Sequence, residues 1–259
     1  MESGICLNSM IPLRAAPAHK SEMTDQLLFG ELFRIQESHK DWYYVQRLAD
    51  HYEGWLTGHQ MMALSAGLVN DILKRPQQVV EHPMMQLSHG DSSTWIPGGA
   101  VLPLFEEESL SFRLGEIRYQ LESPLKHLSG NTRERAEKAA GQYLNAPYLW
   151  GGKTLLGMDC SGFTQIVFRI CGLTLPRDSQ QQLQRGSALS FIREARPGDL
   201  AFFDNEEGEI VHTGIMLGAD RIIHASEKVR IDPVDHQGIY NRQRKQYTHR
   251  LRVIKNVID

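Results

Sequence analysis

The sequence has few cysteines and no cysteine pair at short spacing. Its three cysteines, Cys6, Cys160 and Cys171, are odd in number and widely scattered over 259 residues. A disulfide framework needs an even set of cysteines, and a cysteine zinc site needs pairs of the C-x-x-C kind. The chain therefore predicts free thiols, with neither a disulfide framework nor a metal held by cysteines.

Long apolar runs and basic runs are also missing. No stretch of about 20 apolar residues occurs, and residues 1–19 lack the basic flank and apolar run of a secretory leader. Lys and Arg number 28 against 31 Asp and Glu, and no basic run interleaves with aromatic residues. We therefore expect no nucleic-acid partner, no membrane partner and a cytoplasmic location. The sequence gives no indication of the oligomeric state.

The N-terminal half carries short β-type runs separated by turn residues. They extend from about residue 5 to 125, for example in LLFGELFRI and GWLTG, with one possible helical turn near 66–73. The run DWYYVQRLADHYEGWL has a looser counterpart in STWIPGGAVLPLFEEESLSFRLGEIRYQL. The pattern predicts two small β-barrel modules, over residues 1–65 and 66–125.

Two helices are predicted in the C-terminal half. Asn131 and Glu134 have the spacing of a capping box, and alanines follow at helical intervals. The run CSGFTQIVFRIC is the second candidate, because Asp159 can cap its start and Gly172 can close its end. Cys160 is therefore expected at a helix N-terminus, which favours the thiolate over the thiol and lowers the pKa of the thiol.

Three strands are predicted after these helices. The runs DLAFFD, IVHTGIML and RIIHAS are joined by connections of hairpin length, so an antiparallel meander is the simplest arrangement. If the GAD connection is a three-residue loop, Gly214 lies opposite His224, and His212 shares that face. His212 is then placed to take the Cys160 proton, while His224 orients the His212 imidazole.

Spacing alone leaves other interpretations open. A cysteine that opens an apolar helix is more often a buried small hydrophobe than a nucleophile. Cys160, His212 and His224 are alternatively zinc ligands, although the chain has no H-E-x-x-H motif and no paired cysteines. The residues by themselves favour a metal-free cysteine–histidine pair over a zinc site.

Six ordered motifs resemble the NlpC family of papain-like cell-wall cysteine peptidases. They are YLWGG, GMDCSGF, LPRDSQQQ, RPGDLAFF, HTGIML and IIHAS, within residues 126–259. The resemblance implies that Cys160 is the nucleophile, His212 the general base and His224 the residue that orients it, with no cofactor. In IPLRAAP, SEMTDQLLFGE and DHYEGWL the N-terminal half resembles the bacterial SH3-like modules of a cytoplasmic branch. The expected fold is α+β, with SH3-like β-barrel modules followed by a papain-like catalytic domain.

The resemblance also implies a substrate. Members of that branch hydrolyse the bond between γ-D-glutamate and L-lysine or meso-diaminopimelate in short murein peptides with a free N-terminal L-alanine. The expected partners are peptides such as L-Ala-γ-D-Glu-L-Lys, from which L-Ala-γ-D-Glu is released during murein peptide recycling or turnover. Alternatives are an acyltransferase or amidase acting on a related amide, and a non-catalytic module that binds cell-wall fragments.

The first SH3-like module is expected to close one end of the substrate groove. By the resemblance, Tyr52 closes it and Glu22 is the candidate acidic residue. A buried ammonium needs a carboxylate partner, so Asp159 beside the nucleophile is expected to share the charge of the L-alanine amine. The alternatives are that Tyr52 belongs to the barrel core, that Glu22 is a solvated charge and that Asp159 only caps a helix.

The motif LPRDSQQQ supplies a second set of substrate contacts. Arg177 and Ser179 are expected to meet the free α-carboxylate of γ-D-glutamate, because a carboxylate leaving water takes a guanidinium or hydroxyl donor. Asp178 belongs to the same set, or else pairs with Arg177. Trp150 is expected to line the groove, beside glycines that let backbone approach the substrate or Cys160; core packing is the alternative for Trp150.

Overall fold

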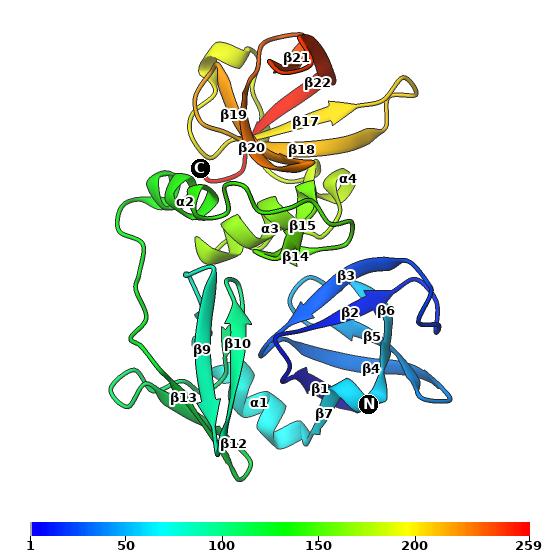
Figure 1. Ribbon diagram of the computed structural model, residues 1–259, viewed down its shortest axis with the longest axis vertical. Helices are drawn as coiled ribbons and strands as arrows, with labels where there is room; N and C mark the ends of the chain where they lie inside the picture. The colour runs from blue at the N-terminus through cyan, green and yellow to red at the C-terminus, as the bar shows by residue number, and fades with distance from the viewer. Residues whose placement is uncertain (1) are drawn as a thin grey trace. The chain divides into compact units, whose positions relative to one another are not determined.

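The computed structural model describes residues 2–259 of the chain. They form two compact units, an N-terminal unit Met1–His127 and a C-terminal unit Leu128–Asp259 (Figure 1). The predicted start of the catalytic domain at residue 126 lies two residues before this division. None of the helices in residues 2–259 has the length and apolar character needed to cross a membrane.

The N-terminal unit begins with a seven-stranded antiparallel sheet in the order β3-β2-β6-β5-β4-β1-β7. Apolar side chains alternate along its strands, and Ile11, Leu13 and Val45 are fully buried inside the sheet. The strands are β1 Ser3–Cys6, β2 Met10–Arg14, β3 Met23–Leu28, β4 Leu32–His39, β5 Trp42–Arg47, β6 Glu53–Thr57 and β7 Met61–Leu64, with a short 3-10 helix at Gly58–Gln60.

The second part of this unit is a helix followed by two small sheets. Helix α1, Ala66–Lys74, replaces the single turn expected near 66–73, because the Ser65 hydroxyl caps it by accepting from the Leu68 N–H at 3.3 Å. The sheets have the orders β10-β9-β13-β12 and β11-β8. Their strands are β8 Gln78–Val79, β9 Met84–His89, β10 Ser92–Pro97, β11 Val101–Leu102, β12 Ser111–Leu114 and β13 Ile117–Leu121.

One hydrophobic cluster joins the two parts of the N-terminal unit. It contains Ile5 and Phe29 from the first part together with Val80, Phe112 and Tyr119 from the second. Phe29 packs edge-on against Phe112 and Tyr119, with ring centroids 6.2 and 5.8 Å away. Because the core is shared, residues 1–127 make one compact unit, and a division into two modules near residue 65 stays a prediction.

The C-terminal unit starts with the two predicted helices. In α2, Thr132–Gln142, the capping box is confirmed: the Asn131 side-chain Oδ1 accepts from the Glu134 N–H at 3.1 Å, and the Glu134 carboxylate accepts from the Asn131 N–H at 3.0 Å. In α3, Cys160–Ile170, the predicted cap is also confirmed, since Asp159 accepts from the Gly162 N–H at 2.7 Å. Gly172 follows the helix with a φ of 82°, which closes it.

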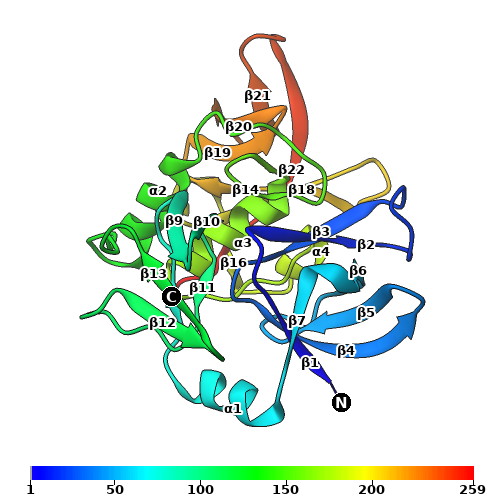
Figure 2. The same cartoon turned by 60° about the horizontal axis from the view of Figure 1, so that its bottom comes forward.

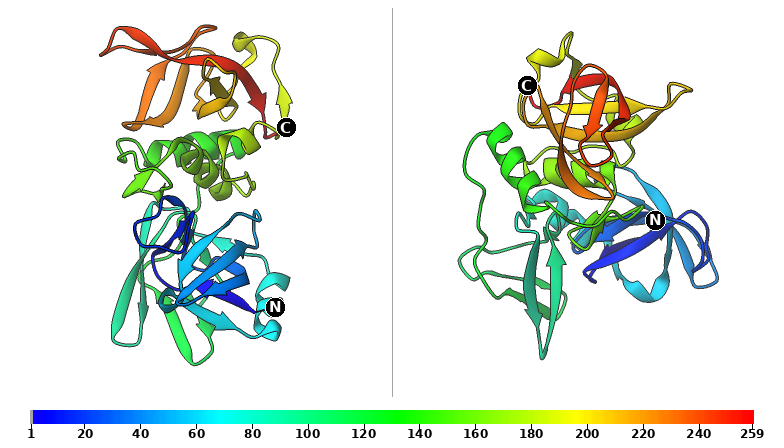
Figure 3. Two further views of the ribbon diagram at one scale, coloured as in Figure 1. Left: turned by 90° about the vertical axis from the view of Figure 1, so that its right-hand side faces the viewer. Right: turned by 45° about the horizontal axis from the view of Figure 1, so that its top comes forward.

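The sheet of this unit has the order β16-β22-β17-β18-β19-β20, with β21 paired to β22, and the predicted antiparallel meander of β17, β18 and β19 is confirmed. Helices α2 and α3 lie on one side of the sheet (Figure 3), and the β21–β22 hairpin projects beyond the rest of the unit (Figure 2).

The remaining elements are β14 Lys153–Thr154, β15 Gly157–Met158, α4 Ser179–Gln182, β16 Ser187–Ala188, a 3-10 helix Ile192–Glu194, β17 Leu200–Asp204, β18 Ile210–Met216, β19 Arg221–Ser226, β20 Lys228–Pro233, β21 Gly238–Asn241 and β22 Gln246–Asn256.

Candidate active site

The β18–β19 hairpin brings two histidines together. Its loop has three residues, since the Leu217 N–H donates to the Arg221 carbonyl at 2.9 Å, as predicted. A Cβ on Gly214 would lie 2.7 Å from the Cβ of His224, so glycine leaves the space that the His224 side chain occupies. Nε2 of His212 lies 2.8 Å from Nδ1 of His224, which confirms that the two side chains share a face.

Helix α3 presents Cys160 to strand β18. The residue is 8 % exposed, and the backbone N–H groups of Thr213 and Ser161 favour its thiolate and so lower the pKa of the thiol. Thr213 follows His212 in β18, so the thiol lies beside the strand that carries the histidine. Nε2 of His212 is engaged with His224, which leaves Nδ1 as the ring nitrogen available to the thiol.

The protonation state of Cys160 differs from the one expected from its place on a helix. Burial raises the pKa of the thiol to about 11 and the Asp159 carboxylate adds to this, against the lowering effect of the Thr213 and Ser161 hydrogen bonds and of Arg177. The loss of solvation destabilises the thiolate by more than the helix N-terminus stabilises it. The expected lowering of the Cys160 pKa is therefore wrong. Burial, followed by the charges of His224 and His249, lowers the pKa of His212 well below its ordinary value. At rest Cys160 is therefore a thiol and His212 a neutral imidazole, which is the form that acts as a base.

Two residues that the sequence did not single out extend the histidine pair. Nε2 of His224 lies 3.1 Å from Oδ2 of Asp232, and Arg230 donates to both oxygens of this carboxylate, from Nε at 2.6 Å and from a terminal nitrogen at 3.0 Å. Burial alone would raise the pKa of Asp232, but the hydrogen bonds from His224 and Arg230 bring it below its ordinary value. No pattern in the sequence pointed to Asp232, because residues 228–233 alternate polar with apolar side chains and so predict an outward aspartate. In β20, a strand that had not been predicted, Asp232 is instead buried and Ile231 is exposed.

A third histidine also lies in the site. The ring of His249 stacks on His212 with centroids 4.1 Å apart and an interplanar angle of 30°. His249 belongs to β22, a strand that pairs with β17 and lies beyond the last predicted strand. Burial, with the charge of His224 adding to it, lowers the pKa of His249 to about 4. The ring therefore stays neutral near pH 7.

Replacing His249 by phenylalanine should make the protein less sensitive to acid. The unfolded chain protonates this histidine near pH 6.5 and the folded chain only near pH 4, so folding stability falls as the pH drops through that window. This difference between the folded and unfolded pKa of His249 corresponds to a loss of up to about 3 kcal/mol in the free energy of unfolding between pH 7 and pH 4. Urea unfolding at both pH values should show a smaller loss for His249→Phe than for wild type, because phenylalanine keeps the stack without the charge. An equal loss in both proteins would contradict this assignment.

Asp159 and Arg177 form a buried, two-pronged ion pair. The guanidinium reaches Oδ1 at 3.0 Å and Oδ2 at 2.6 Å, and it also reaches the Ser161 hydroxyl at 2.9 Å. The Asp159 carboxylate further accepts from the N–H groups of Gly151 at 2.9 Å and Gly162 at 2.7 Å. Asp159 thus caps the helix and holds Arg177, and its contact with a substrate ammonium stays a prediction.

The other two residues of the LPRDSQQQ motif lie at the start of the short helix α4. Asp178 occupies the N-cap position without a side-chain cap, and Ser179 is the first helical residue. Arg177, directly before them, pairs with Asp159. The contacts of Arg177, Asp178 and Ser179 with a substrate carboxylate stay predictions.

The glycines of the YLWGG segment let its backbone approach α3, the helix that begins at Cys160, while an approach to substrate stays a prediction. A Cβ on Gly152 would lie 2.4 Å from the Gly157 carbonyl oxygen, and a Cβ on Gly162 would lie 2.4 Å from the Gly152 carbonyl oxygen. These glycines let backbone segments pack against each other, which brings the turn onto the helix N-terminus. Trp150 is 62 % exposed, so it is not a core residue.

Tyr148, in the same segment, is a site residue that the sequence reasoning missed. Burial raises its pKa to about 12, and the next contribution comes from the charge of Cys160, with Asp159 adding to it. Tyr148 therefore belongs to the electrostatic surroundings of Cys160. The motif YLWGG was recognised, but only its tryptophan and glycines were assigned roles.

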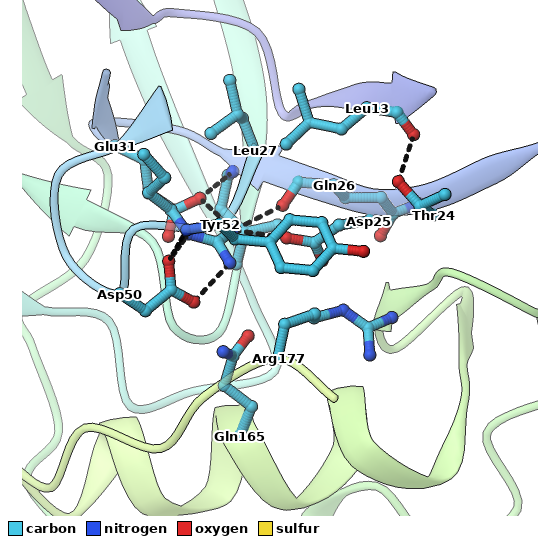
Figure 4. A network of polar contacts seen from close by, with 12 residues as sticks. Leu13, Thr24, Asp25, Gln26, Leu27, Glu31, Asp50, Tyr52, Gln165 and Arg177 are labelled. Atoms are coloured by element: carbon cyan, nitrogen blue, oxygen red, sulfur yellow. Dashed lines mark hydrogen bonds and ion pairs between the residues drawn. The ribbon is translucent and has the colours of Figure 1, made fainter. Parts of the chain in front are cut away.

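Tyr52 and Glu22 belong to the N-terminal unit. Tyr52 is partly buried against the cluster that contains Ile11 and Leu13, and the Arg47 guanidinium lies 5.8 Å from its ring centroid. Arg47 is itself bound to Asp25 at 2.6 Å, in the polar network that Figure 4 shows around Tyr52. Glu22 is exposed, and its carbonyl accepts from the Ala15 N–H at 3.0 Å. Their expected roles toward the substrate amine stay predictions.

The zinc alternative concerns the same histidines. Within residues 2–259, no three His, Cys, Asp or Glu side chains are grouped so that they could hold a metal ion. In the histidine cluster, Nε2 of His212 and Nδ1 of His224 point at each other at hydrogen-bond distance. The site is arranged for proton transfer between side chains.

Comparison with known proteins agrees with this geometry. Residues 145–248 match the NlpC/P60 family, and residues 13–61 match the bacterial dipeptidyl-peptidase Sh3 domain. The γ-D-glutamyl-L-lysine dipeptidyl-peptidase of Bacillus subtilis is 28 % identical over 217 residues, covering 77 % of this chain and 71 % of that protein. Dipeptidyl-peptidase 6 of Lysinibacillus sphaericus is 28 % identical over 271 residues, covering 93 % of this chain and 95 % of that protein.

A solved structure shares the fold. The crystal structure of an NlpC/P60 family protein from Bacillus cereus superposes with a TM-score of 0.82 at 20 % sequence identity, covering 99 % of this chain and 100 % of that one. The order of domains expected from the sequence is thereby confirmed. The chain carries a bacterial dipeptidyl-peptidase SH3 domain followed by an NlpC/P60 domain, and it is a cysteine peptidase.

Proposed function

We propose that this protein hydrolyses the γ-D-glutamyl-L-diamino acid bond of short murein peptides with a free N-terminal L-alanine. The products are L-Ala-γ-D-Glu and the L-lysine or meso-diaminopimelate fragment, in murein peptide recycling or turnover in the cytoplasm. The observation that carries the proposal is the buried His212–His224 hydrogen bond beside the Cys160 thiol. Two relatives that cover 77 % and 93 % of the chain are named for dipeptidyl-peptidase activity, which supports this choice of substrate.

The chemistry follows from the resting protonation states. Nδ1 of His212 takes the thiol proton as the Cys160 sulfur attacks the γ-carbonyl of D-glutamate. The Cys160 N–H, at the start of α3, donates to the oxyanion that develops. The His212 imidazolium then gives its proton to the departing amine, leaving a thioester on Cys160. A water molecule deprotonated by His212 hydrolyses the thioester and regenerates the thiol.

The two ends of the peptide would be recognised by different residues. The proposal assigns the α-carboxylate of γ-D-glutamate to Arg177 and the Ser179 hydroxyl, and assigns the L-alanine ammonium to Tyr52 and Glu22. Ammonium recognition excludes peptides whose amine is acylated, because a carboxylate left without its cation would be buried at a cost. Short free peptides would therefore be substrates, and intact wall strands would not.

Peptide cleavage assays with matched cysteine variants test the proposal. The substrates are L-Ala-γ-D-Glu-L-Lys, its diaminopimelate form and its N-acetylated form, and mass spectrometry identifies the products. Wild type should release L-Ala-γ-D-Glu from the free-amine peptides only. Cys160→Ala should abolish release, whereas Cys171→Ala should not, because Cys171 is a buried thiol at the other end of α3.

The same assay separates the alternatives. Equal cleavage of the N-acetylated peptide would remove the proposed recognition of the ammonium. An acyltransferase would give transfer products when a second amine is supplied. A module that only binds wall fragments would leave all three peptides intact, with wild type and Cys160→Ala behaving alike.

A further inference from the structure

The hydrogen-bonded chain behind the catalytic pair ends in a carboxylate that the mechanism has not used. Asp232 is 4 % exposed and lies on β20, and Nε2 of His224 points at its Oδ2 from 3.1 Å. His224 is 1 % exposed, so water does not compete for this contact. The order along the chain is Cys160, His212, His224 and Asp232, carried by α3, β18, β19 and β20.

The hydrogen-bonding capacity of a carboxylate fixes the direction of every bond in this chain. An ionised carboxylate only accepts, so Nε2 of His224 must carry the hydrogen. A neutral imidazole has one N–H, so Nδ1 of His224 is then an acceptor. Nε2 of His212, 2.8 Å away, must therefore donate to it. Nδ1 of His212 is left with a lone pair, which is the form that accepts a proton from Cys160.

We propose that Asp232 is a positioning residue for the reaction, because its hydrogen bond with His224 fixes the tautomers of both histidines so that His212 is a base. The inference rests on the cysteine peptidase activity and not on the choice of peptide. Without Asp232, the opposite direction becomes available: Nδ1 of His224 donates to Nε2 of His212. Nδ1 of His212 then carries a hydrogen and does not take the thiol proton.

Arg230 keeps the Asp232 carboxylate ionised, which is the form that can only accept hydrogen bonds. It donates to Oδ2 from Nε at 2.6 Å and to Oδ1 at 3.0 Å, so both oxygens are held as acceptors. The other charged or titratable groups around the pair are His249 from β22 and, at the far end from Asp232, Cys160 and Asp159 of α3. Nε2 of His224 is hydrogen-bonded to Asp232.

The test replaces Asp232 by leucine, which cannot accept a hydrogen bond. The value of kcat should fall by about 10- to 100-fold, by analogy with the loss of carboxylates that orient metal-bound histidines, with little change in KM. The alkylation rate of Cys160 by iodoacetamide should fall in the same proportion, and this readout needs no peptide. Nitrogen-15 NMR of the histidine rings should show hydrogen on Nε2 of His212 in wild type and on Nδ1 in part of the variant.

Two further variants separate positioning from folding. Asp235→Asn changes another aspartate after β20, which bonds Tyr247 and neither histidine, so it should leave kcat and both tautomers unchanged. Asp232→Asn keeps the volume of the side chain. Its alkylation rate should fall only by the fraction of molecules in which Nδ1 of His212 carries the hydrogen. A fall in alkylation rate with wild-type tautomers in either Asp232 variant, or wild-type alkylation in Asp232→Leu, would overturn the proposal. Failure of every peptide to be cleaved by wild type would count against the proposed substrate alone.

Discussion

Replacing His212 by glutamine should slow peptide cleavage at pH 7 by about 10⁴-fold, comparable with losses seen when a catalytic residue of such a group is removed. The reason is the pKa of the Cys160 thiol, which burial raises to about 11. A thiol with that pKa has roughly one thiolate in 10⁴ molecules at pH 7, four pH units below it. Wild type overcomes this because His212 removes the proton during the attack; the variant has to rely on thiolate formed by exchange with solvent.

The pH dependence gives the sharper readout of this prediction. The rate of His212→Gln should rise by about tenfold per pH unit between pH 7 and pH 9, whereas wild type should change little over that range. Initial rates measured on one peptide across the range test this, with circular dichroism to confirm folding. His236→Gln, an exposed histidine of the same unit, is the matched control and should keep wild-type rates. A variant rate that does not depend on pH would contradict the assignment.

Replacing Arg177 by methionine should weaken the C-terminal unit by about 3–5 kcal/mol, the usual cost of removing one partner from a buried ion pair. Asp159 is 6 % exposed and would keep a carboxylate that has lost the guanidinium bound to both of its oxygens. The effect should appear first at the N-terminus of α3, which Asp159 caps. Hydrogen exchange of the α3 amides should therefore be faster by at least about 100-fold if the local opening energy falls by that amount.

Matched variants test whether charge is the cause. Arg193→Met removes an exposed arginine that stacks on Phe191, with 4.6 Å between the guanidinium carbon and the ring centroid, and should change stability by less than about 0.5 kcal/mol. Combining Arg177→Met with Asp159→Asn should restore part of the loss, since the second change removes the stranded charge. If the loss of unfolding free energy in the double variant equals the sum of the losses in the two single variants, Asp159 and Arg177 have no interaction energy, which would contradict the prediction.

Local rules were enough to predict a large part of this site. Capping chemistry identified the starts of α2 and α3, because the side chains that satisfy the free N–H groups lie within three residues of them. The three-residue loop after Leu217 fixed which residues face each other across the hairpin. The pairing of His212 with His224 followed from that parity, since side chains alternate along a strand.

Residues brought in from distant segments could not be predicted in this way. Asp232 and His249 reach the histidines from β20 and β22, and their contacts depend on strand order and register in the folded sheet. Arg177 forms its ion pair with Asp159, 18 residues away, and not with the adjacent Asp178 as one alternative had it. The spacing of Asp159, Arg177 and Asp178 along the chain does not predict which carboxylate binds the guanidinium, because that depends on which side chains are buried together.

Short-range features of the sequence were enough to predict Cys160 as the nucleophile and His212 as the base, and to establish the order of the two domains, because motifs, caps and turn lengths act over a few residues. The protonation state of Cys160 and the partners of His224 depend instead on tertiary packing. Burial of Cys160 beneath β18 raises the pKa of a thiol that its helix position alone would lower. Desolvation depends on everything packed around a group, and that environment exists only once distant segments have folded together.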